Sequence, residues 1–251
     1  RMMSASIGKT YFAAMAIDLI QQGKLRLDDR LSKFLADEDW FDRIPNSNEL
    51  TIELLMRHQS GIPRYILNRK VWGDIMSDPD KKWRPGDQLT YIYDSAPLHP
   101  AGKGWAYSDT NYILLGLVLE KISGTGVYQY VNEKFLVPHK LTDTVPNNRR
   151  EIPGLIQGYA KMFQGFGVPE RVIEDGKFVF NPAMEWCGGG FACTSLDLAR
   201  WAQLYFSGEL FDNDYLELLQ RDAALATMLG KGTRYGLGVM IRPSKLGEYL
   251  G

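Results

Sequence analysis

Two apolar segments with helical spacing, residues 8–22 and 111–122, place the strongest constraint on the fold of this chain. In the first, apolar side chains recur every three or four residues between Phe12 and Ile20, which is the spacing of one helix face. Gly23 follows at a position where helices commonly end. The second segment precedes Gly124 and has these residues on or near one face: Ile113, Leu114, Leu117, Val118 and Ile122. The sequence therefore predicts two strong helices.

Shorter helices and a few strands are predicted around these two segments. Cap residues and apolar spacing indicate helices ending near Leu35, from Thr51 to Arg57, from Val127 to Leu136 and from Leu196 to Phe206. Alternation at Phe178 and Phe180 indicates short strands within residues 155–181. A strand over Tyr235–Ile241, a turn over Arg242–Gly247 and a hairpin partner beginning at Tyr249–Leu250 are predicted next. Four prolines make residues 64–106 a predicted loop region.

The composition is that of an ordinary globular protein, and it excludes several kinds of function. Of 251 residues, 45% are hydrophobic and 24% are charged, and the length fits one large domain or two small ones. The net charge of −1 gives no electrostatic reason to expect nucleic acid or an anionic membrane surface as a partner. No apolar run approaches the roughly 20 residues that span a bilayer, so no integral membrane segment is expected. The chain opens on Arg1-Met2-Met3, without the pattern of a signal peptide.

The two cysteines, Cys187 and Cys193, do not indicate a metal site. A metal would need histidine or carboxylate partners nearby, and the three histidines lie far away in the sequence, at His58, His99 and His139. Free, partly buried thiols are the favoured interpretation, with a disulfide as the alternative. No metal and no other cofactor is predicted.

A candidate nucleophile stands directly before the first helix, in Ser6-Ile7-Gly8-Lys9. Residues three apart share a helix face, so the Lys9 amine can lie against the Ser6 hydroxyl. A serine hydroxyl is a weak nucleophile until a neighbouring base takes its proton, and lysine does so when burial or charge lowers its pKa. The motif alone is weak evidence, because about one Ser-x-x-Lys is expected by chance in a chain of this size. An exposed serine beside a solvated lysine would explain it as well.

A second motif, Tyr107-Ser108-Asp109, lies in the loop that leads into the second strong helix. A tyrosine at the mouth of a site acts as a general base or proton relay when a cation favours its phenolate. Trp105, two residues earlier, is a candidate for the wall of a substrate pocket, with burial in the core as the alternative.

With these motifs in this order, the chain resembles the serine β-lactamase and penicillin-binding-protein superfamily. The similarity is to its class C-like branch, which includes D-aminopeptidases and esterases and whose second motif is Tyr-x-Asn. Three further segments carry the resemblance along the chain: Gln22 to Asp29, Thr51 to Pro63, and Gly188 to Trp201.

The resemblance implies an α+β fold of the β-lactamase/transpeptidase type, an antiparallel sheet flanked by helices. Residues 1–251 would form one partial domain, with a mainly helical subdomain over about 41–185. Ser6 would be acylated, and its backbone N–H would supply half of an oxyanion hole. Lys9 and Tyr107 would share its proton and later help to activate water. A periplasmic or secreted location also follows from the resemblance.

Two other positions carry a weaker functional expectation. Gly189, in the run Gly188-Gly189-Gly190, is a candidate for close approach to a substrate, although a backbone turn that needs positive φ explains glycine equally well. His58 could act as a base, but the resemblance places it in a packed turn, which is the favoured interpretation.

The sequence departs from the family pattern at Asp109, where asparagine is expected. Asparagine can donate a hydrogen bond to a substrate amide carbonyl while it accepts one from the lysine, whereas an ionised aspartate only accepts. Asp109, the third residue of the second motif and so a candidate substrate-binding residue, would hold Lys9 charged or repel a carbonyl oxygen. This argues against efficient lactam turnover.

The family's third motif, His/Lys-x-Gly, is absent from these 251 residues. We therefore expect the chain to be truncated at both ends, with this motif directly after Gly251 and most of the sheet outside the chain. The favoured function is a serine hydrolase that cleaves a small ester, amide or peptide substrate. A β-lactamase or D-Ala-D-Ala carboxypeptidase, or a non-catalytic penicillin-binding or sensor relative, is the alternative.

Overall fold

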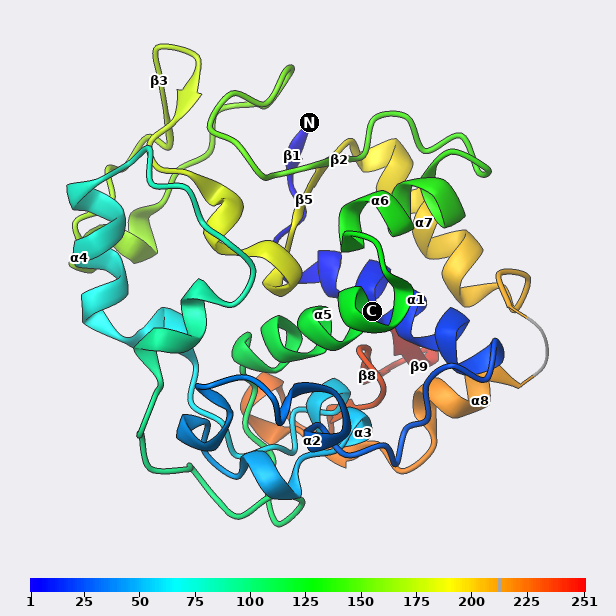
Figure 1. The fold of residues 1–251 in the computed structure, drawn as a ribbon. Coiled ribbons are helices and arrows are strands. Elements are labelled where there is room, and N and C mark those ends of the chain that lie inside the picture. The colour runs from blue at the N-terminus through cyan, green and yellow to red at the C-terminus, as the bar shows by residue number, and fades with distance from the viewer. Residues whose placement is uncertain (212–213) are drawn as a thin grey trace.

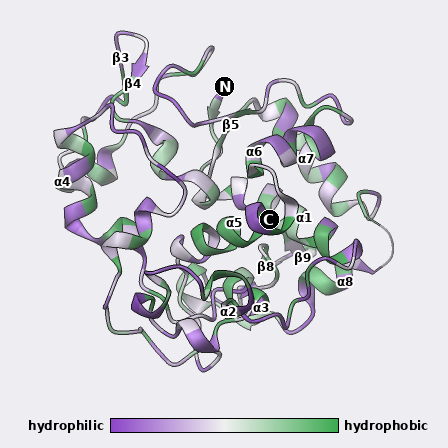
Figure 2. Cartoon of the chain, in the orientation of Figure 1, coloured by the Kyte–Doolittle hydropathy of each residue, from purple (hydrophilic) through white to green (hydrophobic). Residues whose placement is uncertain are grey.

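Helices α1 (Lys9–Gln21) and α5 (Thr110–Ser123) lie side by side at the centre of the molecule (Figure 1). The structure is a computed structural model that describes residues 1–211 and 214–251. Most side chains of both helices are buried, and Figure 2 shows the two as largely hydrophobic segments. Because each is enclosed on nearly all sides, the two segments form the core of the fold, and the prediction of two strong helices is confirmed.

The smaller helices surround this central pair. They are α2 (Ser32–Leu35), α3 (Ile52–Met56), α4 (Arg69–Ser77), α6 (Val127–Val131), α7 (Ser195–Phe206) and α8 (Tyr215–Gln220). The predicted caps are present, since Thr51 Oγ1 accepts the Leu54 N–H at 3.3 Å and Thr194 Oγ1 accepts the Asp197 N–H at 3.2 Å. A π-helical turn over Asn132–Leu136 extends α6 to the predicted end.

Helix α4 lies inside residues 64–106, a region that the sequence predicted to be rich in loops without indicating this helix. Asn68 caps the helix by accepting the Lys70 N–H at 3.0 Å. Val71, Trp72 and Ile75 are buried on one side of the helix. This short helix is stabilised by the contacts of its buried face rather than by its own length.

A three-stranded antiparallel sheet joins the start of the chain to its middle, with β5 (Phe191–Cys193) between β1 (Met2–Met3) and β2 (Val145–Pro146). Met3 pairs with Ala192, and the next residue, Ser4, donates its backbone N–H to Phe191 at 2.9 Å. The pairing therefore brings the residues just after β1 next to those just before β5, which are the glycines Gly188 to Gly190.

A four-stranded antiparallel sheet closes the C-terminal part of the structure. Its order is β6 (Ala224–Leu225), β7 (Arg234–Tyr235), β8 (Met240–Ser244) and β9 (Gly247–Leu250). The single strand predicted over Tyr235–Ile241 is wrong, because residues 236–239 interrupt it. A side chain at Gly236 would collide with the Leu219 carbonyl oxygen, and Gly238 has a φ of +76°. The turn is shorter than predicted, because β8 continues to Ser244 and only Lys245 and Leu246 lie between the strands. The partner strand also begins earlier than predicted, at Gly247 rather than Tyr249.

Residues 155–181 contain one short antiparallel ribbon, β3 (Ile173–Glu174) with β4 (Lys177–Phe178). The α+β class with antiparallel sheets agrees with the sequence prediction. The division into a partial domain with a helical subdomain over about 41–185 stays a prediction. No helix within the described residues is both long enough and apolar enough to cross a membrane.

Candidate active site

Ser6 lies in a 3-10 turn, Ala5–Gly8, that runs directly into α1. The side chain of Ser6 is exposed, whereas Gly8 and Lys9 are buried. The turn is fixed at its start, because Ser4 is buried and its Oγ donates to the Phe191 carbonyl at 2.9 Å. Ala5 has a φ of +47°, an uncommon value for a residue with a side chain. The backbone thus turns sharply just before Ser6 and presents its hydroxyl at the surface.

The glycines before β5 pack directly against this turn. The ideal Cβ of a residue at Gly8 would overlap the Gly189 carbonyl, and a Cβ at Gly189 would lie 3.0 Å from the Ala5 carbonyl oxygen and 2.7 Å from Oε2 of Glu185. Gly190 has a φ of +74°. The run is therefore glycine for close backbone packing and a positive-φ turn. Gly189 packs behind Ser6, and it is Gly188 that borders a cavity.

Lys9 connects three parts of the chain through its ammonium group. Nζ donates to Ser6 Oγ at 3.2 Å, to Asp109 Oδ1 at 2.8 Å, and to the Gly188 carbonyl oxygen. Only 1% of the residue is exposed. The predicted approach of Lys9 to Ser6 on one helix face is present, and the lysine is buried rather than solvated.

Tyr107 lies across the site from Lys9. The Lys9 Nζ is 5.1 Å from the centre of the Tyr107 ring. The Tyr107 hydroxyl is buried and has no hydrogen-bond partner among the described residues. Ser6 and Lys9 are far from Tyr107 in the sequence, and the fold brings the three together in space as the sequence predicted.

His58 supports the loop that carries Tyr107. Its Nδ1 accepts the Ser108 N–H at 3.3 Å and lies 3.0 Å from Nδ2 of Asn111. Its ring is 4.3 Å from the Tyr107 ring. Burial, together with the nearby Lys9 charge, lowers the pKa of His58 to about 3, so the ring is neutral at physiological pH. This is the packed structural position predicted for His58.

Asp109 is bound by two cations. Oδ1 accepts from Lys9, and Oδ2 accepts from Arg64 Nε at 3.0 Å and Arg64 Nη2 at 2.8 Å. Burial by itself would raise the pKa of the Asp109 carboxyl, but Lys9 and Arg64 outweigh it and lower the pKa to about 2. Asp109 is therefore ionised at neutral pH. This cluster of three charged side chains, Lys9, Arg64 and Asp109, is called the charge cluster below.

The charge cluster sets the protonation of Lys9. Burial lowers the pKa of Lys9, but the attraction of Asp109 and Tyr107 outweighs this effect, so the net direction is upward. Lys9 is therefore an ammonium ion at neutral pH. As such it donates to Ser6 Oγ and has no lone pair with which to accept a proton.

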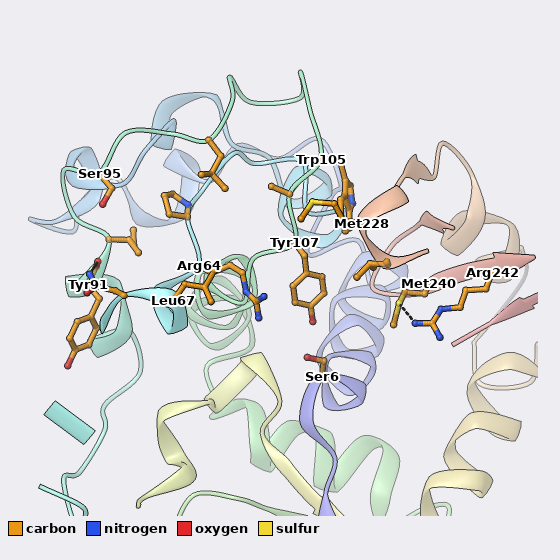
Figure 3. A pocket seen from close by; sticks show the side chains of 16 residues that line it. Ser6, Arg64, Leu67, Tyr91, Ser95, Trp105, Tyr107, Met228, Met240 and Arg242 are labelled. Carbon is orange, nitrogen blue, oxygen red and sulfur yellow. Dashed lines mark hydrogen bonds between the residues drawn. The ribbon is translucent and has the colours of Figure 1, made fainter. Parts of the chain in front are cut away.

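Ser6 opens into a cavity of about 760 Å³. Figure 3 shows Ser6 at its floor, with Tyr107 directly above it and Arg64 beside Tyr107. Trp105 lines this cavity together with Ser6, and its role as a substrate contact stays a prediction. The remaining wall is mainly apolar and includes Leu67, Ile92, Leu98, Met228 and Met240, with Arg242 at one side.

A second cavity of about 370 Å³ is also lined by Ser6. Glu185 lines it together with Phe163 and Phe166. Burial raises the pKa of Glu185, and Asn147 Nδ2 donates to its Oε2 at 2.9 Å. The wall thus combines aromatic rings with a carboxyl group.

Sequence reasoning missed Arg64 and Glu185. Arg64 directly follows Pro63, the end of a segment that carries the family resemblance. No pattern in the sequence around Arg64 indicates that its side chain contacts Asp109. Glu185 precedes Gly188 by three residues, and only the packing of the glycines against the Ser6 turn brings it to the cavity that Ser6 also lines. Cys187 and Cys193 are free and buried. Among residues 1–211 and 214–251 no three His, Cys, Asp or Glu side chains are grouped as a metal site.

Comparisons with known proteins identify the family and the fold. A sequence model of the family described as Beta-lactamase matches residues 1–251. Penicillin-binding protein 4* of Bacillus subtilis (strain 168) is 25% identical over 96% of this chain and 52% of its own length. The D-alanyl-D-alanine-carboxypeptidase/endopeptidase AmpH of Escherichia coli (strain K12) is 26% identical over 97% of this chain and 61% of its own. The chain thus spans between half and two thirds of these relatives.

Among solved structures, a D-stereospecific amidohydrolase from Streptomyces sp. superposes with a TM-score of 0.86. It is 24% identical in sequence, and the match covers 99% of this chain and 73% of that one. This likeness shows that the two chains share the β-lactamase/transpeptidase fold.

Proposed function

Because the chain belongs to the β-lactamase family, we propose that it carries the active site of a serine hydrolase that cleaves an ester or amide through an acyl-enzyme on Ser6. The observation that supports this most is the buried Lys9 ammonium, which donates to an exposed Ser6 hydroxyl at 3.2 Å beneath the Tyr107 ring. A solvated lysine beside a surface serine would be neither buried nor placed beneath an aromatic ring.

In the proposed reaction the Ser6 hydroxyl oxygen attacks the substrate carbonyl carbon, and a new C–O bond forms. Because Lys9 is already protonated, the Tyr107 hydroxyl accepts the proton of Ser6 and passes its own proton to the leaving alcohol or amine, as the bond from that group to the carbonyl carbon breaks. In the second half, a water oxygen attacks the carbonyl carbon of the acyl-enzyme. The water proton passes through the Tyr107 hydroxyl to Ser6 Oγ as the bond from Ser6 to the carbonyl carbon breaks, which releases the carboxylic acid and restores Ser6. Lys9 stays charged, and it stabilises the developing negative charge on the oxygen of Ser6.

The cavity supports a small substrate with an apolar acyl part. A cleft of about 760 Å³ with a mainly apolar wall is in the usual range for small-molecule sites. The names of the relatives, a penicillin-binding protein and a D-alanyl-D-alanine-carboxypeptidase/endopeptidase, favour an amide or peptide bond. Trp105 is proposed as a substrate contact on this wall. Asp109 acts through Lys9 and Arg64, and Gly189 through the packing of the Ser6 turn.

A second candidate function is a relative that is acylated but does not turn over. The charge cluster favours it, because a Lys9 held as an ammonium cannot serve as the base for deacylation. A periplasmic or secreted location stays a prediction drawn from the family resemblance.

Turnover of a short-chain p-nitrophenyl ester and of a D-alanyl-D-alanine peptide by the full-length protein tests the proposal. We expect Ser6→Ala to abolish both. Ser95→Ala is the matched control, since Ser95 lines the same cavity away from Lys9, and it should retain activity. Equal turnover by the wild type and Ser6→Ala would refute the proposal, whereas a stable acyl adduct without turnover would favour the second candidate.

A further inference from the structure

We propose that Arg64 supplies the hydrogen-bond donor that Asp109 lacks, and that its guanidinium binds a carbonyl oxygen on the acyl side of the substrate. The inference rests on the proposed function and names one feature of the substrate, a second carbonyl such as that of an acylamino group.

Asp109 itself has no means of binding such a carbonyl. Both of its oxygens are acceptors, and both are occupied, Oδ1 by Lys9 and Oδ2 by the Nε and Nη2 of Arg64. The residue is 8% exposed, and its pKa of about 2 keeps it without a proton at neutral pH. A donor must therefore come from another side chain.

Arg64 has donors left after it binds Asp109. A guanidinium carries five N–H groups in a fixed plane, and the contact with Asp109 uses Nε and Nη2. Among the described residues, Nη1 makes no hydrogen bond or ion pair. About a third of the side chain is exposed, and Arg64 lines both cavities that border Ser6. Figure 3 shows the guanidinium next to Tyr107, on the side that faces Ser6.

The backbone on either side of Arg64 is fixed against the residues on either side of Asp109. The Pro63 carbonyl accepts from Ser108 Oγ at 3.1 Å and from Thr110 Oγ1 at 2.8 Å, and the Tyr65 N–H donates to Thr110 Oγ1 at 3.1 Å. The Arg64 guanidinium carbon also lies 5.1 Å from the centre of the Tyr107 ring. The donor is thus held in place before a substrate arrives, which lowers the entropic cost of binding.

Charge and surroundings favour a neutral carbonyl over a carboxylate. Asp109 offsets the charge of Arg64, so the attraction for an anion is weakened, whereas the N–H groups remain available. The cavity wall around Arg64 is apolar at Pro63, Leu67 and Leu98. In such surroundings a carbonyl loses less hydration than a carboxylate on entering.

The test uses the full-length protein and compares three p-nitrophenyl esters that differ only beside the reacting carbonyl. One is the N-acetyl-phenylalanine ester, the second is the 3-phenylpropanoate ester, which lacks the acetamido group, and the third is the N-succinyl-phenylalanine ester. Arg64→Leu should lower the kcat/KM ratio of the first to the second about tenfold or more. The double variant Arg64→Leu with Asp109→Asn should recover most of the ratio, because the introduced side-chain amide would then donate. Arg242→Leu is the control, a cation on the same cavity wall, and should leave the ratio unchanged.

Arg64→Lys keeps a cation against Asp109, so it tests the same ratio if Arg64→Leu does not fold, and the ratio should fall here too. An unchanged ratio in either variant, with turnover of the 3-phenylpropanoate ester intact, would overturn the role of Arg64 and leave the serine hydrolase in place. A loss confined to the N-succinyl ester would overturn the choice of a neutral carbonyl. Failure of the wild type to cleave any ester would instead count against the proposed function.

Discussion

The Nζ of Lys9 lies 2.8 Å from Oδ1 of Asp109, and both side chains are nearly inaccessible to solvent. A buried charge without a partner is strongly unfavourable, so the state of each residue depends on the other. Asp109 is ionised because two cations surround it, and Lys9 is charged because Asp109 is ionised. The activity of the site should therefore depend on residue 109 through the protonation of Lys9.

Replacement of Asp109 by asparagine should move the pH profile of kcat/KM to lower pH. With the carboxylate, the pKa of Lys9 is raised above its ordinary value of 10.5. Without it, the remaining effect of burial lowers that pKa, so Lys9 loses its proton, and with it the charge that stabilises the oxygen of Ser6, at lower pH. We expect the alkaline fall in kcat/KM to begin at lower pH in the Asp109→Asn variant than in the wild type. Asp87→Asn, at a surface ion pair away from Ser6, is the control, and coincident profiles for the wild type and Asp109→Asn would contradict the account.

Removal of the Tyr107 hydroxyl should lower the activity of the protein without lowering its stability. This hydroxyl is buried without a partner among the described residues, so Tyr107→Phe removes an unsatisfied polar group and should leave the free energy of unfolding unchanged or slightly higher. Because the Tyr107 hydroxyl is the proposed proton-transfer group, Tyr107→Phe should lower kcat about 100- to 10,000-fold.

The control for Tyr107 is Tyr205→Phe, which removes another buried hydroxyl that lacks a partner in the described part of the chain but leaves the cavity as it is. Thermal unfolding and steady-state kinetics measure both effects. A Tyr107→Phe variant that keeps its kcat would remove Tyr107 from the mechanism.

His58 should make folding stability depend on pH without affecting the site near neutrality. Its pKa is about 3 in the folded protein and about 6.5 in an unfolded chain. The unfolded state therefore binds the proton first, and stability is complete above about pH 6.5 and falls as the pH is lowered toward 3. Chemical denaturation across this window should show the loss, and His58→Gln should flatten it. The exposed His139 provides the control variant His139→Gln, and an unaltered slope in His58→Gln would contradict the assignment.

A methyl group at Gly8 should disrupt the site at its base. The added Cβ would overlap the Gly189 carbonyl oxygen, so the Ser6 turn and the glycine run must separate. We expect Gly8→Ala to lower the free energy of unfolding by about 2 kcal/mol or more. Gly73 in α4 has open space around its Cβ position, and Gly73→Ala should stabilise the protein by about 0.5–1 kcal/mol. Equal effects of the two substitutions on the free energy of unfolding would show that the close contact between Gly8 and Gly189 does not limit the size of the residue at position 8.

The sequence predicts those elements whose signals are local. The apolar spacing of residues 8–22 and the caps at Thr51 and Thr194 are visible in short windows, and the structure has helices at all three places. The helix α4 was missed because prolines before and after it dominate the local signal. The predicted strand over Tyr235–Ile241 is too long. It is interrupted where Gly236 lies close to Leu219 in α8, and this contact is not visible in the local sequence.

For the site, two short motifs were enough to bring Ser6, Lys9 and Tyr107 together. The charge on Asp109 was also recognised, but the prediction that it would repel a carbonyl oxygen did not include Arg64. The contact of Arg64 with Asp109 arises from the packing of the segment around Pro63 against residues 108–110, which no local pattern records. Likewise, only the pairing of β1 with β5 places Glu185 next to the Ser6 turn.

Covalent labelling of Ser6 tests the central claim most directly. The full-length protein is treated with a fluorophosphonate, digested, and analysed by mass spectrometry to locate the adduct. The account predicts one adduct, on the peptide that contains Ser6 and Lys9, with Ser6 as the modified residue, and slower labelling in Tyr107→Phe. An adduct on a different residue, or labelling of Ser6→Ala at the rate of the wild type, would contradict it.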